Sequence, residues 1–293
     1  MSTASVAIVI PTFNRVAYLE NAIRKSLEQT HPCQVIVCDH GSSDTTPQAM
    51  RAYADRVTYI RRERDLGPHF CWLEGVLNAD AEYIHLQFDD DWTEKDFIAQ
   101  TLTLMEPDVG FVFTEAYEFN EDTQERRRCY RLAESFTTGI HDAGIVERLL
   151  LQGRNISPAS CLFRKKDVID ALYQGALPIL TEHGYHGVGP DHFMSLLCVL
   201  RYRKVGVITE PLAVFRAHPG SITVNAQGDD ERLVKLNRAY EATRSYYRLL
   251  RLFHRSSWVR WRVAGKPLLK TMERWLKLFL LFVKLRKKAV KPL

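Results

Sequence analysis

The sequence has few cysteines, and they are not arranged as a disulfide framework or a zinc site. Six cysteines are scattered along 293 residues without a CxxC pair, which excludes a small disulfide scaffold and predicts reduced thiols. The chain also lacks a GxGxxG fingerprint and a Walker A loop. These absences argue against dinucleotide-dependent enzymes and P-loop enzymes.

Long hydrophobic runs are missing as well. The longest wholly apolar run is Leu278 to Val283, far short of the ~20 residues that a membrane-spanning helix needs. Near the N-terminus, the apolar run Val6 to Ile10 ends at Pro11 and follows no basic segment, so a signal peptide is not expected. The sequence therefore predicts a cytoplasmic protein without a transmembrane segment.

Repeats and low-complexity tracts are absent too, which excludes solenoids and propellers, and a hydrophobic fraction of 46% is enough for a substantial core. Charge, in contrast, is unevenly distributed. Residues 231–293 hold 18 Lys and Arg against three acids, whereas the 230 residues before them hold 22 Lys and Arg against 32 acids. An acidic body with a basic end predicts that the C-terminal part meets an anionic surface.

Short apolar runs alternate with helical patterns over the first 90 residues. Val6 to Ile10 is typical of a strand buried on both faces, and Leu19, Ile23 and Leu27 follow it at helical spacing. The same alternation predicts strands at 35–38, 57–60 and 83–86 and helices at 45–54 and 68–77. This order predicts the α/β class with a mainly parallel central sheet.

The pattern is looser further along. We predict strands at 111–114, 205–208 and 212–215 and helices at 145–151 and 191–200. Residues 1–228 are expected to form one domain, and residues 229–293 a strongly basic helical extension, broken or kinked at Gly265 to Pro267.

Ligands of parallel sheets bind beyond the carboxyl ends of the strands, which here are the polar loops 11–15, 39–44, 61–67 and 88–92. The last of these loops contains three consecutive acids, Asp89 to Asp91. Because adjacent carboxylates repel one another, a divalent metal would neutralise them, and alternate carboxylates can converge on one Mg²⁺ or Mn²⁺. The alternative is an acidic loop that caps a helix beginning near Thr93.

Five motifs stand in order along residues 5 to about 225. They are the string VAIVIPTFNR through CDHGSSDTT, then DLG, QFDDDW, GPDHF and VFRAHPGSIT. Together they resemble the family 2 inverting glycosyltransferases of GT-A fold. The resemblance implies that residues 1–228 are a GT-A catalytic domain. It would move a sugar from a nucleotide-sugar donor, UDP- or dTDP-sugar favoured, to a glycan or lipid-linked acceptor in bacterial surface polysaccharide assembly.

The resemblance also implies a nucleotide pocket at the carboxyl ends of the first two strands. Pro11, Thr12 and Arg15 would line it, although Thr12 and its neighbour Asn14 can equally cap the helix that follows. Asp39 would accept a hydrogen bond from the imide N–H of uracil or thymine, which cytosine lacks.

The alternative role for Asp39 is that of a turn aspartate beside Gly41. Asp65 and Gly67 match the family's NxG loop near the base, with Asp in place of the commoner Asn.

The acidic triplet matches the family's DxD motif. The resemblance implies that Asp89 and Asp91 hold Mn²⁺ or Mg²⁺ at the donor diphosphate, with His218 as a further ligand. Asp90 would contact the nucleotide sugar or take the place of Asp89 on the metal. Arg216 would contact the nucleotide sugar as well and neutralise charge on the departing phosphate.

A catalytic base is needed to take the proton of the acceptor hydroxyl. Asp191 matches the second acid of the family's ED segment, where Pro190 replaces the commoner Glu. The alternative for Asp191 is to cap the following helix, and Glu182 is the second candidate base. Trp92, beside the triplet, either stacks on a sugar or fills the core.

The basic extension carries a second prediction. Lys270, Arg274 and Lys277 begin a cationic stripe that runs beside Trp275 and Phe279, a pattern typical of helices that lie on anionic membranes. We therefore expect peripheral attachment to the inner face of the plasma membrane. The alternative is a helix that packs within the protein or forms a dimer and keeps its cationic face in solvent. Nucleic acid is not expected as a partner, because no nucleic-acid-binding motif is present. A GT-A-fold scaffold without catalysis is the competing function, and no pattern indicates the oligomeric state.

Overall fold

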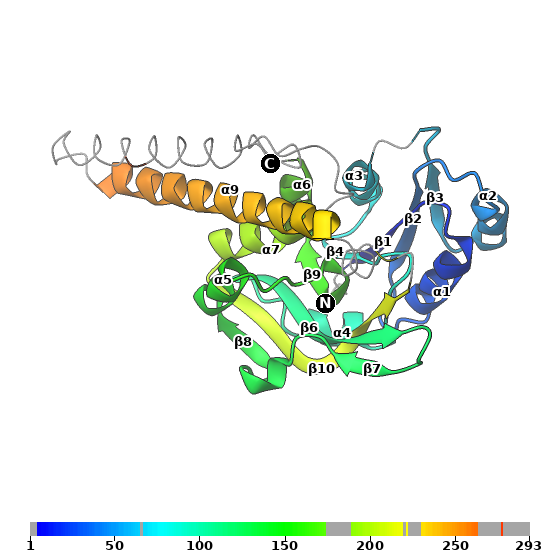
Figure 1. Ribbon diagram of the computed structural model, residues 1–293, viewed down its shortest axis with the longest axis horizontal. Helices are drawn as coiled ribbons and strands as arrows, with labels where there is room; N and C mark the ends of the chain where they lie inside the picture. The colour runs from blue at the N-terminus through cyan, green and yellow to red at the C-terminus, as the bar shows by residue number, and fades with distance from the viewer. Residues whose placement is uncertain are drawn as a thin grey trace.

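The computed structural model describes residues 5–64, 67–173, 189–218, 221, 230–262 and 277. Within them, a ten-stranded mixed sheet carries helices on both faces (Figure 1), so the predicted α/β class is confirmed. Several predictions lie outside the described residues. They concern Asp65, Glu182, the break at 265–267 and, apart from Lys277, the cationic stripe that begins at Lys270.

The first four strands form the parallel part of the sheet. They are β1 (Val6–Thr12), β2 (Gln34–Asp39), β3 (Thr58–Arg61) and β4 (Tyr83–Leu86), in the spatial order β3-β2-β1-β4. Successive side chains of a strand point to opposite faces, and in β1 Ile8 and Ile10 enter one core while Ala7 and Val9 enter the other. The strand is therefore buried on both faces, as its continuous apolar run predicts.

The other strands add antiparallel pairs that the local pattern does not predict. Strand β9 (Cys161–Arg164) is inserted antiparallel between β4 and β6 (Val109–Asn120). Strand β10 (Lys204–Ala217) runs parallel to β6, and β5 (Trp92–Thr93) and β8 (Gly139–Asp142) lie antiparallel to β10, while β7 (Arg126–Arg128) is antiparallel to β6.

Two strands are longer than predicted. Strand β6 extends well beyond residues 111–114, and the two strands predicted at 205–208 and 212–215 form the single strand β10. Its register with β6 shifts on both sides of Pro211, which is consistent with a proline that cannot donate a ladder hydrogen bond. The predicted gap between two strands is thus an irregularity inside one strand.

The helices cover the two faces of the sheet. Helix α1 (Val16–Leu27), the short α2 (Thr46–Ala49) with the 3-10 turn Met50–Tyr53, and α4 (Phe97–Leu102) belong to one side. Helices α3 (Pro68–Asn78), α5 (Ala143–Leu151), α6 (Lys165–Tyr173) and α7 (Pro190–Arg201) belong to the other. Two more 3-10 turns span Leu132–Glu134 and Pro158–Ser160.

Helix α9 (Asp230–Arg262) lies along α7 and continues past the sheet (Figure 1). The Tyr246 ring packs 5.4 Å from that of Phe193 in α7, and the Tyr247 hydroxyl donates a 2.5 Å hydrogen bond to Glu147 of α5. Arg251 pairs with the same Glu147 carboxylate at 2.9 Å. This part of α9, up to Arg251, is therefore docked on the body.

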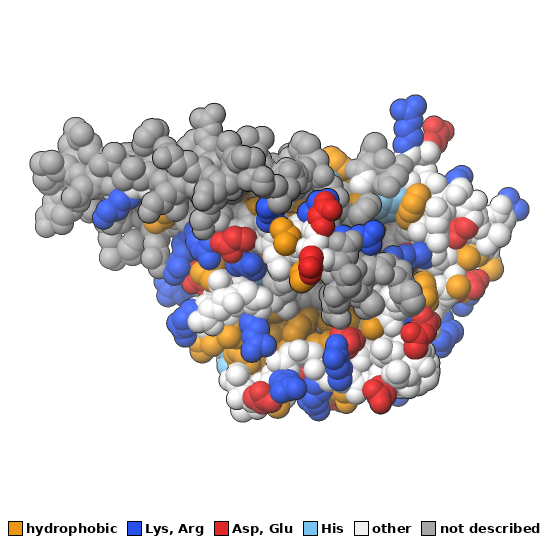
Figure 2. All heavy atoms as spheres, viewed as in Figure 1, with side chains coloured by type: hydrophobic (Ala, Val, Ile, Leu, Met, Phe, Trp, Pro, Cys, Tyr) orange, Lys and Arg blue, Asp and Glu red, His pale blue; other side chains and the backbone are white. Residues whose placement is uncertain are grey.

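Charged side chains of both signs are interspersed over the described body on the face shown in Figure 2. On that face, the acidic side chains are not gathered into one patch. Within the described part of the chain, no helix is long and apolar enough to cross a membrane. All six cysteines are unpaired, as predicted.

Candidate active site

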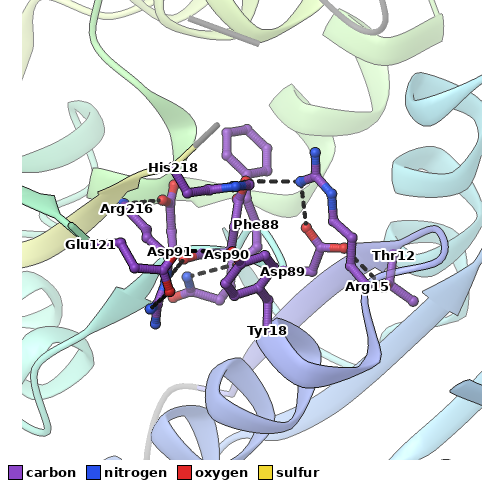
Figure 3. Close-up of polar contacts among 11 residues, drawn as sticks. Thr12, Arg15, Tyr18, Phe88, Asp89, Asp90, Asp91, Glu121, Arg216 and His218 are labelled. Atoms are coloured by element: carbon purple, nitrogen blue, oxygen red, sulfur yellow. Dashed lines mark hydrogen bonds and ion pairs between the residues drawn. The ribbon is translucent and has the colours of Figure 1, made fainter. Parts of the chain in front are cut away.

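The carboxyl ends of β1 and β4 lie side by side at the point where the strand order switches. From β1 the chain builds β2 and β3 on one side and then returns to place β4 on the other, and such switch points are where open α/β sheets bind ligands. Thr12 ends β1, and its hydroxyl donates a 2.9 Å hydrogen bond to Asp89 in the loop after β4 (Figure 3). Thr12 thus contacts the acidic triplet, and it does not cap α1, whose first residues lack a side-chain cap from it.

Arg15, which precedes α1, is the main cation facing the triplet. Its Nη1 atom donates to Asp89 Oδ1 at 3.2 Å and to Asp90 Oδ2 at 2.8 Å. One guanidinium group therefore bridges two consecutive carboxylates, and the side chain is about a third exposed, at 31%. A cation held at the mouth of an acidic site in this way is well placed to meet an anionic ligand.

The end of β10 approaches the triplet from the other side. The two-residue strand β5, which follows the triplet directly, pairs with β10 through Trp92 and Val214. That pairing places the Arg216 backbone N–H 3.0 Å from Asp91 Oδ1, and the Arg216 Nε atom donates to the Asp90 carbonyl oxygen at 3.2 Å. Two segments more than 120 residues apart in sequence are thereby joined at one site.

His218 lies just beyond the end of β10. Its Nε2 atom is 3.1 Å from Asp90 Oδ2, and its ring packs 4.6 Å from that of Tyr18. The structure therefore joins His218 to Asp90, the residue that the resemblance gave as the substitute for Asp89. The predicted set of Asp89, Asp91 and His218 as metal ligands stays a prediction.

The Arg216 side chain is fixed by groups that sequence reasoning missed. Its Nη1 atom donates to Glu121 at 3.0 Å, and the Tyr18 hydroxyl donates to the other oxygen of Glu121 at 2.9 Å. The guanidinium carbon lies 5.0 Å from the Trp92 ring centre and 5.1 Å from that of Tyr18. Trp92 is buried and supports Arg216 from within the fold.

Of the two residues that sequence reasoning missed, Tyr18 and Glu121, only Tyr18 has a signal in the local sequence. Tyr18 stands three residues after Arg15, and residues at that spacing share a helix face. Glu121 follows the end of β6, in a charged segment for which the sequence pattern predicts no helix or strand. Its position depends on the length of β6, which the sequence pattern underestimates.

The three carboxyl groups of the triplet have different electrostatic environments. Burial raises the pKa of Asp89 to about 7, and it raises the pKa of Asp91 well above its ordinary value. The nearby negative charge of Asp90 raises both pKa values further. Burial acts on Asp90 in the same direction, but the His218 hydrogen bond and the Arg15 charge together lower its pKa. Ionisation is therefore less favourable at Asp89 and Asp91 than at Asp90.

These groups suit a hard divalent cation. Carboxylates and a neutral imidazole are ligands that Mg²⁺ and Mn²⁺ accept, and two buried acids with raised pKa values are groups whose protons a cation would replace. No cluster of three or more His, Cys, Asp and Glu side chains arranged to hold a metal is found among the described residues. Metal binding by these side chains therefore stays a prediction.

Asp39, at the end of β2, is fully buried and hydrogen-bonded within the protein. Its Oδ1 atom accepts from the Gly41 and Ser42 amides at 3.0 and 2.7 Å, and its Oδ2 atom accepts from the Tyr59 hydroxyl at 2.5 Å. Arg61 Nε lies 3.5 Å from the same Oδ2. The turn role considered for Asp39 is thus present, and base recognition stays a prediction.

The remaining loop residues support the same edge of the sheet. Pro11 is buried within β1. The Asn14 side chain accepts hydrogen bonds from the amides of Ser43 and Asp44, which ties the loop after β1 to the loop after β2. Gly67 precedes α3 with φ 90°, a left-handed conformation that favours glycine.

Asp191 occupies the first turn of α7, apart from the network around the triplet. Its Oδ1 atom accepts from the amides of Gly189 and His192, each at 2.7 Å, and Tyr240 of α9 donates to its Oδ2 atom at 3.4 Å. Burial raises the pKa of Asp191 to about 6, although its hydrogen bonds act in the opposite direction. The carboxylate therefore binds the helix terminus through one oxygen and keeps a pKa that suits proton transfer near neutral pH.

Replacing Thr12 with valine is expected to lower the free energy of unfolding by about 1.5–3 kcal/mol, the usual loss for a hydrogen bond to a charged group. Thr12 and Asp89 are both buried, so water cannot replace the hydroxyl. Urea unfolding at pH 8 measures the change. Thr101→Val is the matched control, because its buried hydroxyl binds only carbonyl groups of its own helix among the described contacts. Equal losses in the two variants would contradict the specific Thr12–Asp89 contact.

Curated proteins of similar sequence include bacterial glycosyltransferases. The abequosyltransferase RfbV of Salmonella typhimurium is 25% identical over 225 residues, which cover 72% of this chain and 66% of RfbV. The putative teichuronic acid biosynthesis glycosyltransferase TuaG of Bacillus subtilis is 26% identical over 114 residues, covering 37% of this chain and 45% of TuaG. The chain thus spans less than two thirds of the length of these relatives.

Solved structures of other proteins share the fold. S. aureus TarS 1-349 in complex with UDP aligns with a TM-score of 0.58 at 14% identity, over 82% of this chain and 65% of that one. The mannosyltransferase PcManGT from Pyrobaculum calidifontis, in complex with GDP-Man and Mn²⁺, aligns with a TM-score of 0.52 at 18% identity. The alignment covers 99% of this chain and 84% of PcManGT. The family model for glycosyl transferase family 2 matches residues 7–171. That span is more than half of the sequence and includes Thr12, β4 and the triplet, so the chain belongs to glycosyl transferase family 2.

Proposed function

We propose that this protein is a metal-dependent inverting glycosyltransferase that moves a sugar from a nucleotide-sugar donor to a glycan or lipid-linked acceptor. The observation that carries the proposal is the network at the switch point. There Thr12, Arg15, Arg216 and His218 come from distant segments and converge on three consecutive acids. A scaffold protein has no physical need to bury carboxylates whose pKa values are raised by burial.

The donor that we propose is a UDP- or dTDP-sugar. One structural neighbour of this fold is described in complex with UDP and with UDP-GlcNAc, and another with GDP-Man, so the fold accommodates nucleotide sugars. Asp39 supports a base with an imide N–H, because a carboxylate offers about four acceptor positions and three are used by hydrogen bonds here. Since Asp39 is fully buried, binding of the base requires a shift of one of its present partners.

The metal that we propose would be held by Asp91 and His218, together with Asp89 or Asp90. When bound, it would supply Lewis-acid stabilisation of the diphosphate. Arg15 and Arg216 are positioned to add fixed positive charge on either side of the triplet. Because Arg216 is held by Glu121 and two aromatic rings, it needs little reorganisation as negative charge develops on the phosphate.

Asp191 is the base that we propose. The acceptor oxygen forms a bond to the anomeric carbon while the bond from that carbon to the phosphate oxygen breaks. The bonding pair leaves with the nucleoside diphosphate, and the proton of the acceptor hydroxyl passes to Asp191. A single in-line displacement of this kind inverts the anomeric centre.

Activity is expected to rise with pH through an apparent pKa of about 6. Burial raises the pKa of Asp191 from 3.8 to about 6, and only the deprotonated form accepts a proton. The same shift favours the protonated group in the folded state, so its stabilising effect is full below pH ~4 and is lost as the pH rises through about 6. Activity and this contribution to stability should therefore change in opposite directions between pH 5 and 7. A pH profile at saturating Mn²⁺ tests this, and a flat profile below pH 7 would contradict it.

The test of the function as a whole is a screen of nucleotide sugars for metal-dependent hydrolysis. Slow hydrolysis of the donor needs no acceptor, so it separates an enzyme from a scaffold of the same fold without knowledge of the acceptor. We expect nucleoside diphosphate release from a UDP- or dTDP-sugar in Mn²⁺ or Mg²⁺, and none in EDTA. Binding of UDP without turnover of any donor would favour the scaffold.

We also propose a role at a membrane surface in bacterial polysaccharide assembly. The relatives RfbV and TuaG, an abequosyltransferase and a putative teichuronic acid biosynthesis enzyme, support the polysaccharide role. The cationic and apolar stripes of residues 270–291 support peripheral attachment to anionic lipid at the inner face of the plasma membrane. Apart from Lys277, which is exposed, these residues lie outside the described part of the chain.

A further inference from the structure

Helix α9 sits directly on the turn that presents Asp191. Gly189, two residues before Asp191, has φ 111°, and a Cβ atom placed on it would lie 2.9 Å from Thr243 Oγ1 of α9. The glycine is therefore required both by its backbone conformation and by the close approach of the second helix. The N-terminus of α7 and the middle of α9 form one packed unit.

Within this unit, Tyr240 is the α9 residue that reaches Asp191. Its hydroxyl donates to Asp191 Oδ2 at 3.4 Å, on the oxygen that the α7 amides leave open. Its ring meets the His192 ring edge to face, with centres 5.7 Å apart and planes at 82°. The hydroxyl is thus aimed at the carboxylate by a fixed ring, and its only described hydrogen bond is to Asp191.

The other ionisable groups around Asp191 do not replace this contact. Burial and the Arg244 charge lower the pKa of His192 to about 3, so its imidazole is neutral near pH 7. Arg244 of α9 pairs with Glu241 at 3.0 Å. Tyr130, which approaches Tyr240 from the segment after β7, has a pKa raised by burial and stays neutral. Among these groups, the Asp191 carboxylate is therefore the acceptor for the Tyr240 hydroxyl.

We infer that Tyr240 is a positioning residue for the catalytic base, so that the C-terminal helix takes part in catalysis by orienting Asp191. The inference rests on the proposed role of Asp191. Asp191 Oδ1 is held by the α7 amides, and a second anchor on Oδ2 fixes the rotation of the carboxylate. Because this hydrogen bond is stronger to the carboxylate than to the carboxylic acid, it also limits the rise in the pKa of Asp191 that burial causes.

The test compares Tyr240→Phe with Tyr247→Phe. Both tyrosines lie on α9 and donate one hydrogen bond to a carboxylate, but the partner of Tyr247 is Glu147 of α5. The pKa of Asp191 is measured by NMR on protein with ¹³C-labelled aspartate carboxyl groups, with Asp191→Asn identifying the signal. Tyr240→Phe is expected to raise this pKa by about half a unit, and Tyr247→Phe should leave it unchanged.

Kinetics on the same variants give the second measurement. With the nucleotide sugar that the hydrolysis screen identifies, Tyr240→Phe should lower kcat by ~10-fold, leave the donor KM unchanged and move the acidic limb to higher pH. An unchanged Asp191 pKa in Tyr240→Phe, or an equal shift in Tyr247→Phe, overturns the inference and leaves the proposed function intact. A raised pKa with a wild-type rate confirms the contact but overturns the positioning role of Tyr240, and the role of Asp191 as base is then decided by the rate of Asp191→Asn.

Discussion

Replacing Asp91 with alanine is expected to abolish detectable transfer and to weaken nucleoside diphosphate binding in Mn²⁺ by ~100-fold or more, the scale set by removing a metal ligand. Asp91 is buried, and burial raises its pKa well above the ordinary value, so the fold keeps an acid where its charge is unfavourable. Its described partner is the Arg216 backbone amide, a single hydrogen bond that does not neutralise a full charge.

The measurement is calorimetric titration of UDP in Mn²⁺ and again in EDTA. The variant and the wild-type protein should bind equally weakly in EDTA, because the lost interaction is made through the metal. Asp108→Ala is the matched control, since Asp108 is an exposed aspartate that pairs with Lys204 at 3.1 Å, away from the triplet. If Asp91→Ala keeps Mn²⁺-dependent affinity for UDP, Asp91 is not a metal ligand, and Asp90 with His218 becomes the better candidate pair.

The sequence predicts the part of the site that depends on local pattern. Continuous apolar runs such as Val6 to Ile10 identify strands that are buried on both faces, and parallel strands place the residues that follow them at one edge. For that reason the sequence pattern alone predicts Thr12 and the triplet at one site, and the structure shows a direct hydrogen bond between Thr12 and Asp89.

The rest depends on pairings between distant segments. Nothing near Cys161 to Arg164 indicates that this segment separates β4 from β6 in the sheet. The contact of Arg216 with Glu121 follows from the extension of β6 alongside β10, including a register shift at Pro211. Such contacts are set by tertiary packing, and local propensity carries little information about them.

The assignment of His218 shows the same limit at finer scale. The motif predicts a histidine near the triplet, and the structure places it there. Which of three consecutive carboxylates it meets depends on how the loop after β4 turns, and its Nε2 atom lies beside Asp90. Sequence spacing alone does not resolve neighbours one residue apart.

Replacing Asp191 with asparagine is expected to lower transfer by ~100-fold or more, the usual effect of removing a positioned base, with donor and metal affinity near the wild-type values. The substitution keeps the local fold, because the amide oxygen of asparagine still accepts from the Gly189 and His192 amides that bind Asp191 Oδ1. What it removes is the proton acceptor. Binding and chemistry should therefore separate in this variant more cleanly than in any variant of the triplet.

The comparison needs kcat and the donor KM from transfer or hydrolysis assays, and UDP affinity in Mn²⁺ from titration. An unfolding midpoint close to that of the wild-type protein would show that the α7 terminus is intact. Since burial raises the pKa of Asp191 to about 6, the asparagine variant should also lose the acidic limb of the pH profile, whereas a variant with a merely damaged site would keep it. Transfer at the wild-type rate would exclude Asp191 as the base and make Glu182 the residue to replace next.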